Sequence, residues 1–190
     1  MRHILWKGAL AGGIVAFMWS IFSWTAIGWP GKVFQSFSDE DKVAQVIHEN
    51  TLQSGVYLLP NPYVRGPGHC DARTANLLKN GPVVFATVQR NGVEDTMIHL
   101  VVSFVSYLLT AFLLSWAVCK TRAMLYFQKV IFITLMGGFV VSLNGILPSY
   151  LWRGFPLNYT LICMADAVIA WFLASLAMVG FLNTDNRKSK

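Results

Sequence analysis

Four long runs of apolar residues divide the chain. Residues 8–29 and 130–151 contain no charged side chain, and residues 96–119 and 157–182 have His99 and Asp166, respectively, as their only acidic or basic side chain. A helix needs about 20 mainly apolar residues to cross the hydrocarbon core of a bilayer. The pattern therefore predicts four transmembrane helices, with one long segment between the first two.

The long segment, residues 30–95, has shorter patterns of its own. Acidic residues followed by an amphipathic stretch predict a short helix at about 39–50, with Ser38 as its N-cap. Two runs rich in β-branched and aromatic residues predict short strands at about 55–60 and about 82–89. We therefore expect a small α+β cap between the first two transmembrane helices.

The composition indicates that lipid surrounds much of the chain. Apolar residues make up 55% of it and charged residues 13%, whereas charged residues are about a quarter of a soluble domain. The expected fold class is an all-α membrane protein, with four transmembrane helices in an antiparallel bundle and the extracytoplasmic cap. The expected parts are residues 1–29 with the first helix, 30–95 with the cap, and 96–190 with the other three helices and a basic tail.

The basic residues are distributed unevenly. Both chain ends and the connection between the second and third helices are basic, whereas residues 30–95 contain six basic and seven acidic side chains. Because cytoplasmic connections are enriched in Lys and Arg, this asymmetry predicts cytoplasmic termini and an outer cap. We expect the membrane to be of the bacterial inner (plasma) membrane type. The net charge of +6 then reflects topology and contact with lipid headgroups. We expect no nucleic-acid partner.

Few patterns typical of catalysis or metal binding occur. The sequence has three cysteines and no C-x-x-C pair. His69, Cys70 and Asp71 are metal-ligand types, but consecutive residues rarely converge on one ion, so they are weak candidates and a polar loop is the simpler interpretation. A buried haem needs two suitable axial ligands, and His99 is the only histidine in a predicted transmembrane helix. We therefore expect no cofactor.

Polar side chains of all four predicted helices fall at a similar depth. With both termini inside, a rise of about 1.5 Å per residue places these groups in the outer half of the bundle. Asp166 is the central member, because a charge within the bilayer costs about 2.5–3.5 kcal/mol and usually faces the bundle interior or water. The predicted binding cluster consists of Asp166, His99, Asn144, Ser23, Ser103 and Trp24.

Three interpretations of this cluster stay open. It can fix the helix register without chemistry, form a pocket for a proton, an ion or a small polar ligand, or place Asp166 against a partner subunit. The lack of catalytic motifs favours a non-catalytic accessory, assembly or structural subunit that docks through its outer cap onto a membrane-protein partner or a second copy. The alternatives are a small transporter or channel-like protein that uses the Asp166 site, and a membrane enzyme acting on lipid or quinone with His99 and Asp166 as an acid–base pair.

Overall fold

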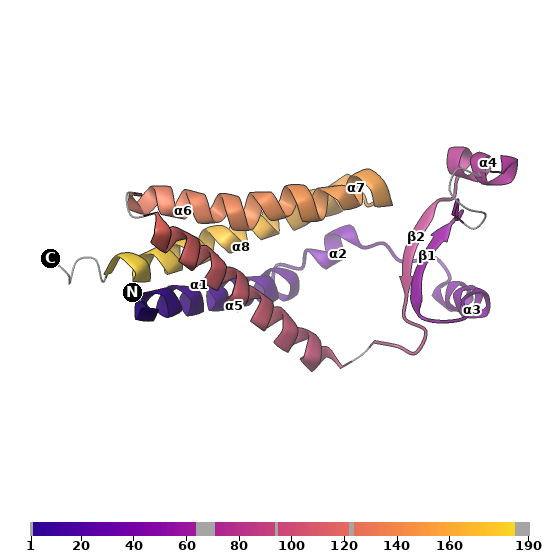
Figure 1. Ribbon diagram of the computed structural model, residues 1–190. Helices are drawn as coiled ribbons and strands as arrows, with labels where there is room; N and C mark the ends of the chain where they lie inside the picture. The colour runs from indigo at the N-terminus through magenta and orange to yellow at the C-terminus, as the bar shows by residue number, and fades with distance from the viewer. Residues whose placement is uncertain (1, 64–70, 94, 122–123, 185–190) are drawn as a thin grey trace. The chain divides into compact units, whose positions relative to one another are not determined.

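The computed structural model describes residues 2–63, 71–93, 95–121 and 124–184 (Figure 1). Its internal contacts divide the chain into two compact units. Met1–Phe34 and Asp95–Lys190 form a helical unit, and Gln35–Glu94 form a small mixed unit. The helical unit contains all the long apolar helices, and the small unit contains the sheet.

Four helical spans of the helical unit are long and apolar enough to cross a membrane, as predicted. Three are single α-helices, namely α1 (Arg2–Thr25), α5 (Thr96–Lys120) and α8 (Leu157–Thr184). The fourth, Tyr126–Arg153, is composite. α1 ends at Thr25 rather than at Trp29, because Gly28 takes a left-handed φ of 70° and Pro30 begins the short helix α2 (Pro30–Val33).

The composite span consists, in order, of α6 (Tyr126–Thr134), the π-helical segments η1 (Leu135–Phe139) and η2 (Ser142–Ile146), and α7 (Leu147–Arg153). η1 contains Gly137 and Gly138, both buried against α8. A methyl group on Gly138 would lie 2.9 Å from the Cα atom of Val168, so no larger side chain fits without moving α8. The two glycines thus bring the backbones of η1 and α8 close together.

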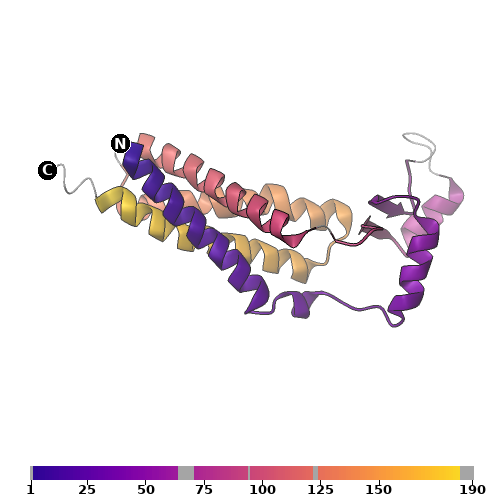
Figure 2. The same ribbon diagram turned by 90° about the horizontal axis from the view of Figure 1, so that it is seen from below.

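Small residues also let α1 approach its neighbours. α1 contacts both α5 and α8, and α8 also contacts α6 and η1 (Figure 2). A methyl group on Gly12 would lie 2.2 Å from Cγ of Met178, and one on Gly13 would lie 2.6 Å from Cδ2 of Leu108. In lipid, close packing of this kind drives helix association. The core that results includes Ala16, Ala111, Ile133, Ala174 and Met178.

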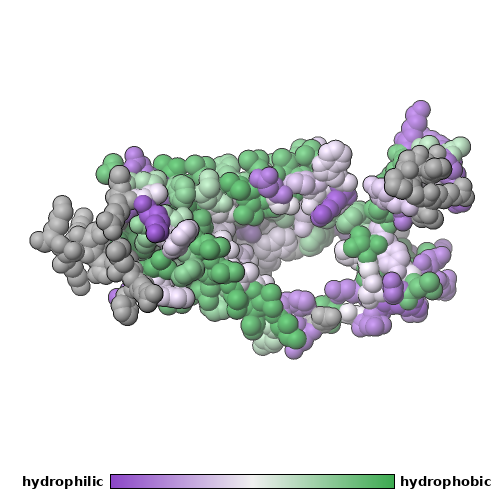
Figure 3. Space-filling model, in the orientation of Figure 1, coloured by the Kyte–Doolittle hydropathy of each residue, from purple (hydrophilic) through white to green (hydrophobic). Residues whose placement is uncertain are grey.

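Large apolar side chains cover much of the outside of the helical unit. Figure 3 shows a mainly apolar surface over its helices. On α5, the side chains of Met97, Val101, Leu109 and Leu113 are all more than half exposed, with exposed fractions of 68%, 61%, 58% and 54%. Monomeric soluble proteins rarely expose contiguous apolar patches larger than a few hundred Å². The helical unit therefore has the surface of an integral membrane protein.

The small unit consists, in order, of α3 (Glu40–Asn50), β1 (Gly55–Leu59), α4 (Ala72–Asn80) and β2 (Val84–Val88). The two strands were predicted, and they pair as an antiparallel two-stranded sheet in which Gly55 pairs with Val88. Arg90, which follows β2, donates a hydrogen bond to the carbonyl oxygen of Thr51 at the end of α3 and so connects the two elements. Neither α3 nor α4 contains a buried residue, so this unit has little core of its own.

One local prediction in the small unit is wrong. The N-cap of α3 is Asp39 rather than Ser38, and its carboxylate accepts a 3.0 Å hydrogen bond from the backbone N–H of Lys42. A carboxylate can satisfy this N–H and also interacts favourably with the positive end of the helix. No element was predicted directly after Asp71, where α4 begins. The Asp71 carboxylate accepts a 2.7 Å hydrogen bond from the backbone N–H of Thr74 and caps that helix.

Candidate intramembrane polar site

The carboxylate of Asp166 is held by two tryptophans. The residue lies in α8 and is 9% exposed. Its Oδ1 atom accepts a 2.7 Å hydrogen bond from Trp19 Nε1, and its Oδ2 atom accepts a 3.0 Å bond from Trp24 Nε1. Among the residues that the structure describes, these indoles are its only hydrogen-bond partners. Each carboxylate oxygen therefore has one donor and retains lone-pair capacity for another.

Both indoles come from the C-terminal part of α1. Trp19 and Trp24 are five residues apart, which places their Cβ atoms about 140° apart around the helix axis. The two side chains therefore leave α1 in different directions and converge on Asp166. Ser23 is fully buried, and its hydroxyl donates a 3.2 Å hydrogen bond to the carbonyl oxygen of Ser20 within α1. This small, internally satisfied side chain lets α1 lie close to its neighbours beside the two indoles.

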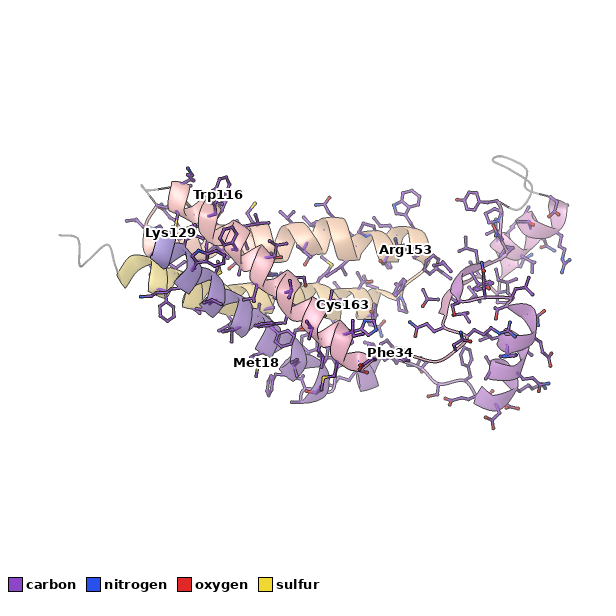
Figure 4. All side chains as sticks on the ribbon, turned by 60° about the horizontal axis from the view of Figure 1, so that its bottom comes forward. Met18, Phe34, Trp116, Lys129, Arg153 and Cys163 are labelled. Atoms are coloured by element: carbon purple, nitrogen blue, oxygen red, sulfur yellow. The ribbon has the colours of Figure 1, made fainter. Side chains whose placement is uncertain are left out.

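Asp166 also lines a partly open pocket of about 310 Å³ inside the helical unit. All four membrane-length spans contribute to its wall. The lining residues are Trp24 of α1, Ser106, Tyr107 and Thr110 of α5, Val141 and Ile146 of the composite span, and Cys163, Asp166, Ala167, Ala170 and Trp171 of α8. Figure 4 labels Cys163 in the middle part of the unit, between the end with Trp116 and Lys129 and the end with Arg153.

The pocket wall presents acceptors and aromatic rings. The hydroxyl of Ser106 donates to the carbonyl oxygen of Ser103 at 2.7 Å, and that of Thr110 donates to the carbonyl oxygen of Ser106 at 2.9 Å. Because their hydrogens are used within α5, these hydroxyls can offer only lone pairs to a ligand. The rings of Tyr107 and Trp171 lie 6.3 Å apart with an interplanar angle of 39°. None of the described residues that line the pocket is basic.

The structure brings together only part of the predicted binding cluster. Trp24 donates to Asp166, and Ser23 is buried nearby in α1 without a hydrogen bond to it. His99 and Ser103 are exposed on α5. Asn144 is exposed on η2, where its amide donates a 3.2 Å bond to the carbonyl oxygen of Val140. These residues share a depth in the sequence pattern, but depth does not determine which way a side chain faces around its helix.

Several site residues are absent from the predicted cluster. Trp19 makes the shorter of the two bonds to Asp166, while Tyr107, Cys163 and Trp171 line the pocket. One signal pointed to Trp19: an indole N–H in the hydrocarbon region needs an acceptor, and Asp166 is the only carboxylate in the predicted transmembrane helices. Tyr107 and Cys163 gave no such signal, because apolar runs routinely contain tyrosine and cysteine.

The weak metal candidates do not form a described site. His69 and Cys70 lie outside the described residues, as does the basic tail, and Asp71 uses its carboxylate to cap α4. Within the described part of the chain, no group of three or more His, Cys, Asp or Glu side chains is placed to hold a metal ion.

Comparison of the chain with protein-family models, curated proteins and solved structures gives no significant match. A half-enclosed pocket with one carboxylate, several oxygen acceptors and three aromatic rings can bind a small molecule that carries hydrogen-bond donors or positive charge.

Proposed function

We propose that this protein is a non-catalytic inner-membrane protein that binds a small ligand in the Asp166 pocket. In this proposal the four spans cross the bilayer as an antiparallel bundle, both termini are cytoplasmic, and the small unit is an outer cap. The basic chain ends and the nearly neutral segment 30–95 support this orientation. The ligand would reach the site from the membrane or from its outer face.

The observation that carries the proposal is that Asp166 both joins α1 to α8 and lines a pocket. A carboxylate that only fixed the helix register would need the two indole donors and no adjoining space. Small-molecule sites are typically about 300–1,000 Å³ in volume and combine apolar walls with a few convergent polar groups. An ionisable residue within a membrane is by default a candidate functional site. The Asp166 pocket meets both descriptions.

The thiol of Cys163 allows a direct test, because it lines the pocket. We suggest measuring its labelling by N-ethylmaleimide in lipid vesicles, in a chain that carries Cys70→Ser and Cys119→Ser. Ser106→Phe places a ring in the pocket wall and should slow labelling severalfold. Ser103→Phe is the matched control, because Ser103 is exposed one turn away on α5 and does not line the pocket.

Two results would overturn the proposal. An unreactive Cys163 would show that molecules of ligand size do not reach the pocket. Equal labelling rates in the Ser106→Phe and Ser103→Phe chains would show that the reagent reaches the thiol by another route. Circular dichroism of both variants should match that of the parent, which confirms that folding is not the cause of any difference.

A second candidate function is docking through the small unit, as an accessory or assembly subunit. Leu52, Val56 and Tyr63 are 94%, 63% and 70% exposed, and an isolated two-stranded sheet is marginally stable in water. A partner on this surface would cover these side chains. Purification in mild detergent tests the idea, and a strictly monomeric protein without any co-purifying partner would contradict it.

The remaining alternatives use the same site. A transporter or channel-like protein would need a pathway through the Asp166 pocket, and the pocket is the feature in its favour. An enzyme with His99 and Asp166 as its acid–base pair would need these side chains within hydrogen-bond distance. His99 is exposed, and the carboxylate of Asp166 accepts hydrogen bonds from the two indoles. The geometry therefore does not support His99 and Asp166 as an acid–base pair.

A further inference from the structure

We infer that the ligand of the Asp166 pocket is an organic cation, namely a lipophilic amine or a quaternary ammonium compound. This inference rests on the proposed function, because it names the ligand class for the same pocket. It is carried by three properties of the wall: a carboxylate with no basic side chain among the described lining residues, aromatic rings from three helices, and hydroxyls that act as acceptors.

The first property is the charge. Asp166 accepts its two hydrogen bonds from neutral indoles, and no described residue that lines the pocket is basic. Hydrogen bonds from both indoles to the two oxygens stabilise a carboxylate anion without neutralising it. Opposite charges attract far more strongly in a protein interior than in water, since the effective dielectric constant is lower. A cation beside Asp166 would therefore complete the site electrostatically, whereas an anion would be repelled.

The second property is the set of rings. Trp24, Tyr107 and Trp171 belong to three different helices, α1, α5 and α8, and all line the pocket. Cations are attracted to the faces of aromatic rings within about 6 Å of the ring centroid, and quaternary ammonium groups are recognised in this way. A cation in this pocket can therefore contact rings that come from more than one helix.

The third property is the direction of the hydroxyl groups. Ser106 and Thr110 direct their hydrogens at backbone carbonyls of α5 and can only accept from a ligand. A protonated amine could donate to these oxygens, and a quaternary ammonium group could lie against them without leaving a donor unsatisfied. At about 310 Å³ the pocket is at the small end of ligand sites, which favours a compact headgroup with an apolar substituent.

A pair of probes with the same shape and different charge tests this inference. Phenyltrimethylammonium is the cation, and tert-butylbenzene replaces its nitrogen by carbon. Both are added to the protein in vesicles of digalactosyldiacylglycerol, whose sugar headgroups carry neither a charge nor an ammonium group, and their protection of Cys163 against N-ethylmaleimide is measured. At equal concentration in the membrane, the apparent affinity of the cation should be at least about tenfold higher than that of tert-butylbenzene. This ratio corresponds to a modest fraction of the energy of a charge–charge interaction at low dielectric constant.

Two variants identify the groups responsible. Asp166→Asn should abolish the preference for the cation while Cys163 still reacts in the absence of probe. Where Asp166→Asn alters the circular dichroism spectrum, Tyr107→Leu takes its place, because it removes one ring and keeps the carboxylate. Tyr107→Leu should weaken protection by the cation about two- to fivefold, the effect of a cation–π contact at a partly exposed site, and leave protection by tert-butylbenzene unchanged.

The possible outcomes separate the inference from the proposed function. Equal protection by the two probes would overturn the inference that the ligand is a cation. The pocket would then be a site for neutral ligands. Protection by neither probe would also overturn the inference that the ligand is a cation. The labelling rates of the Ser106→Phe and Ser103→Phe chains would then decide whether the pocket itself exists.

Discussion

The two indole bonds to Asp166 should couple α1 to α8 energetically, and a double-mutant cycle can measure that coupling. Hydrogen bonds to a charged group contribute about 1.5–3 kcal/mol in water-soluble proteins, whereas bonds measured within membranes average about 0.6 kcal/mol with a maximum of about 1.7. The bond from Trp19 is 2.7 Å long and that from Trp24 is 3.0 Å. We therefore expect a coupling of about 1–1.7 kcal/mol for Trp19 with Asp166, and about 0.5–1 kcal/mol for Trp24.

The cycle combines Trp19→Phe or Trp24→Phe with Asp166→Asn. An asparagine side chain has only one oxygen, so its amide NH₂ group would face one of the indole N–H groups. Two hydrogen-bond donors would then point at each other. Asp166→Asn alone should therefore destabilise the helical unit by about 1–3 kcal/mol. Replacing the opposed indole by phenylalanine should recover part of that loss. Loss of apolar contacts from the smaller ring affects both arms of the cycle equally and cancels.

The assay is equilibrium unfolding in mixed micelles of mild detergent and dodecyl sulfate, followed by far-ultraviolet circular dichroism. Trp116→Phe is the control, because Trp116 is 52% exposed on α5 and stacks with Lys120 rather than with Asp166. Its coupling to Asp166→Asn should be zero within error. The claim that these bonds hold α1 and α8 together would be refuted if the coupling energies of Trp19 and of Trp24 were both below about 0.5 kcal/mol. This value is the usual error of additivity.

Three further predictions concern packing, capping and topology. Gly138→Ala should destabilise the helical unit by about 1–3 kcal/mol through a clash with the α8 backbone, whereas Gly145→Ala, which meets open space toward other helices, should be neutral or slightly stabilising in the same unfolding assay. Asp71→Ala should destabilise α4 by about 1 kcal/mol, because the helix loses its N-cap. The rate of hydrogen exchange at the start of α4 should rise about fivefold as a result. In a chain with its three native cysteines replaced by serine, in right-side-out vesicles, an impermeant maleimide should label Leu52→Cys, and it should label Leu125→Cys only after permeabilisation. Labelling of both residues, or of Leu125→Cys alone, would contradict the proposed orientation.

The membrane spans were predictable because they depend on a one-dimensional property. A run of about 20 apolar residues needs no knowledge of its neighbours, since lipid provides the same surroundings on every side. The two strands were predictable for a similar reason, because their β-branched runs are bounded by Gly and Pro. The end of α1 was not, because the apolar run continues past Gly28 to Trp29, whereas the backbone at Gly28 leaves the helical conformation.

The site was only partly predictable, because it depends on the rotation of each helix. The sequence predicts that Asp166 needs hydrogen-bond partners from other helices, and Trp24 of α1 is one of them. Which groups face Asp166 depends on contacts such as Gly12 with Met178 and Gly138 with Val168, which set the rotation of α1 and of the composite span against α8. These contacts join residues far apart in sequence and leave no local pattern.

The position of the Asp166 bonds in the chain has a consequence for biosynthesis. The donors Trp19 and Trp24 precede their acceptor by 147 and 142 residues. At about 5–20 residues per second, a ribosome needs about 7–30 s to make the intervening chain. During that time α1 is in the membrane with two indole N–H groups that lack their acceptor. The first helix can therefore complete its packing only when the last one has been inserted, so a chain truncated before α8 would present an incomplete α1 surface to the machinery that removes unassembled membrane proteins.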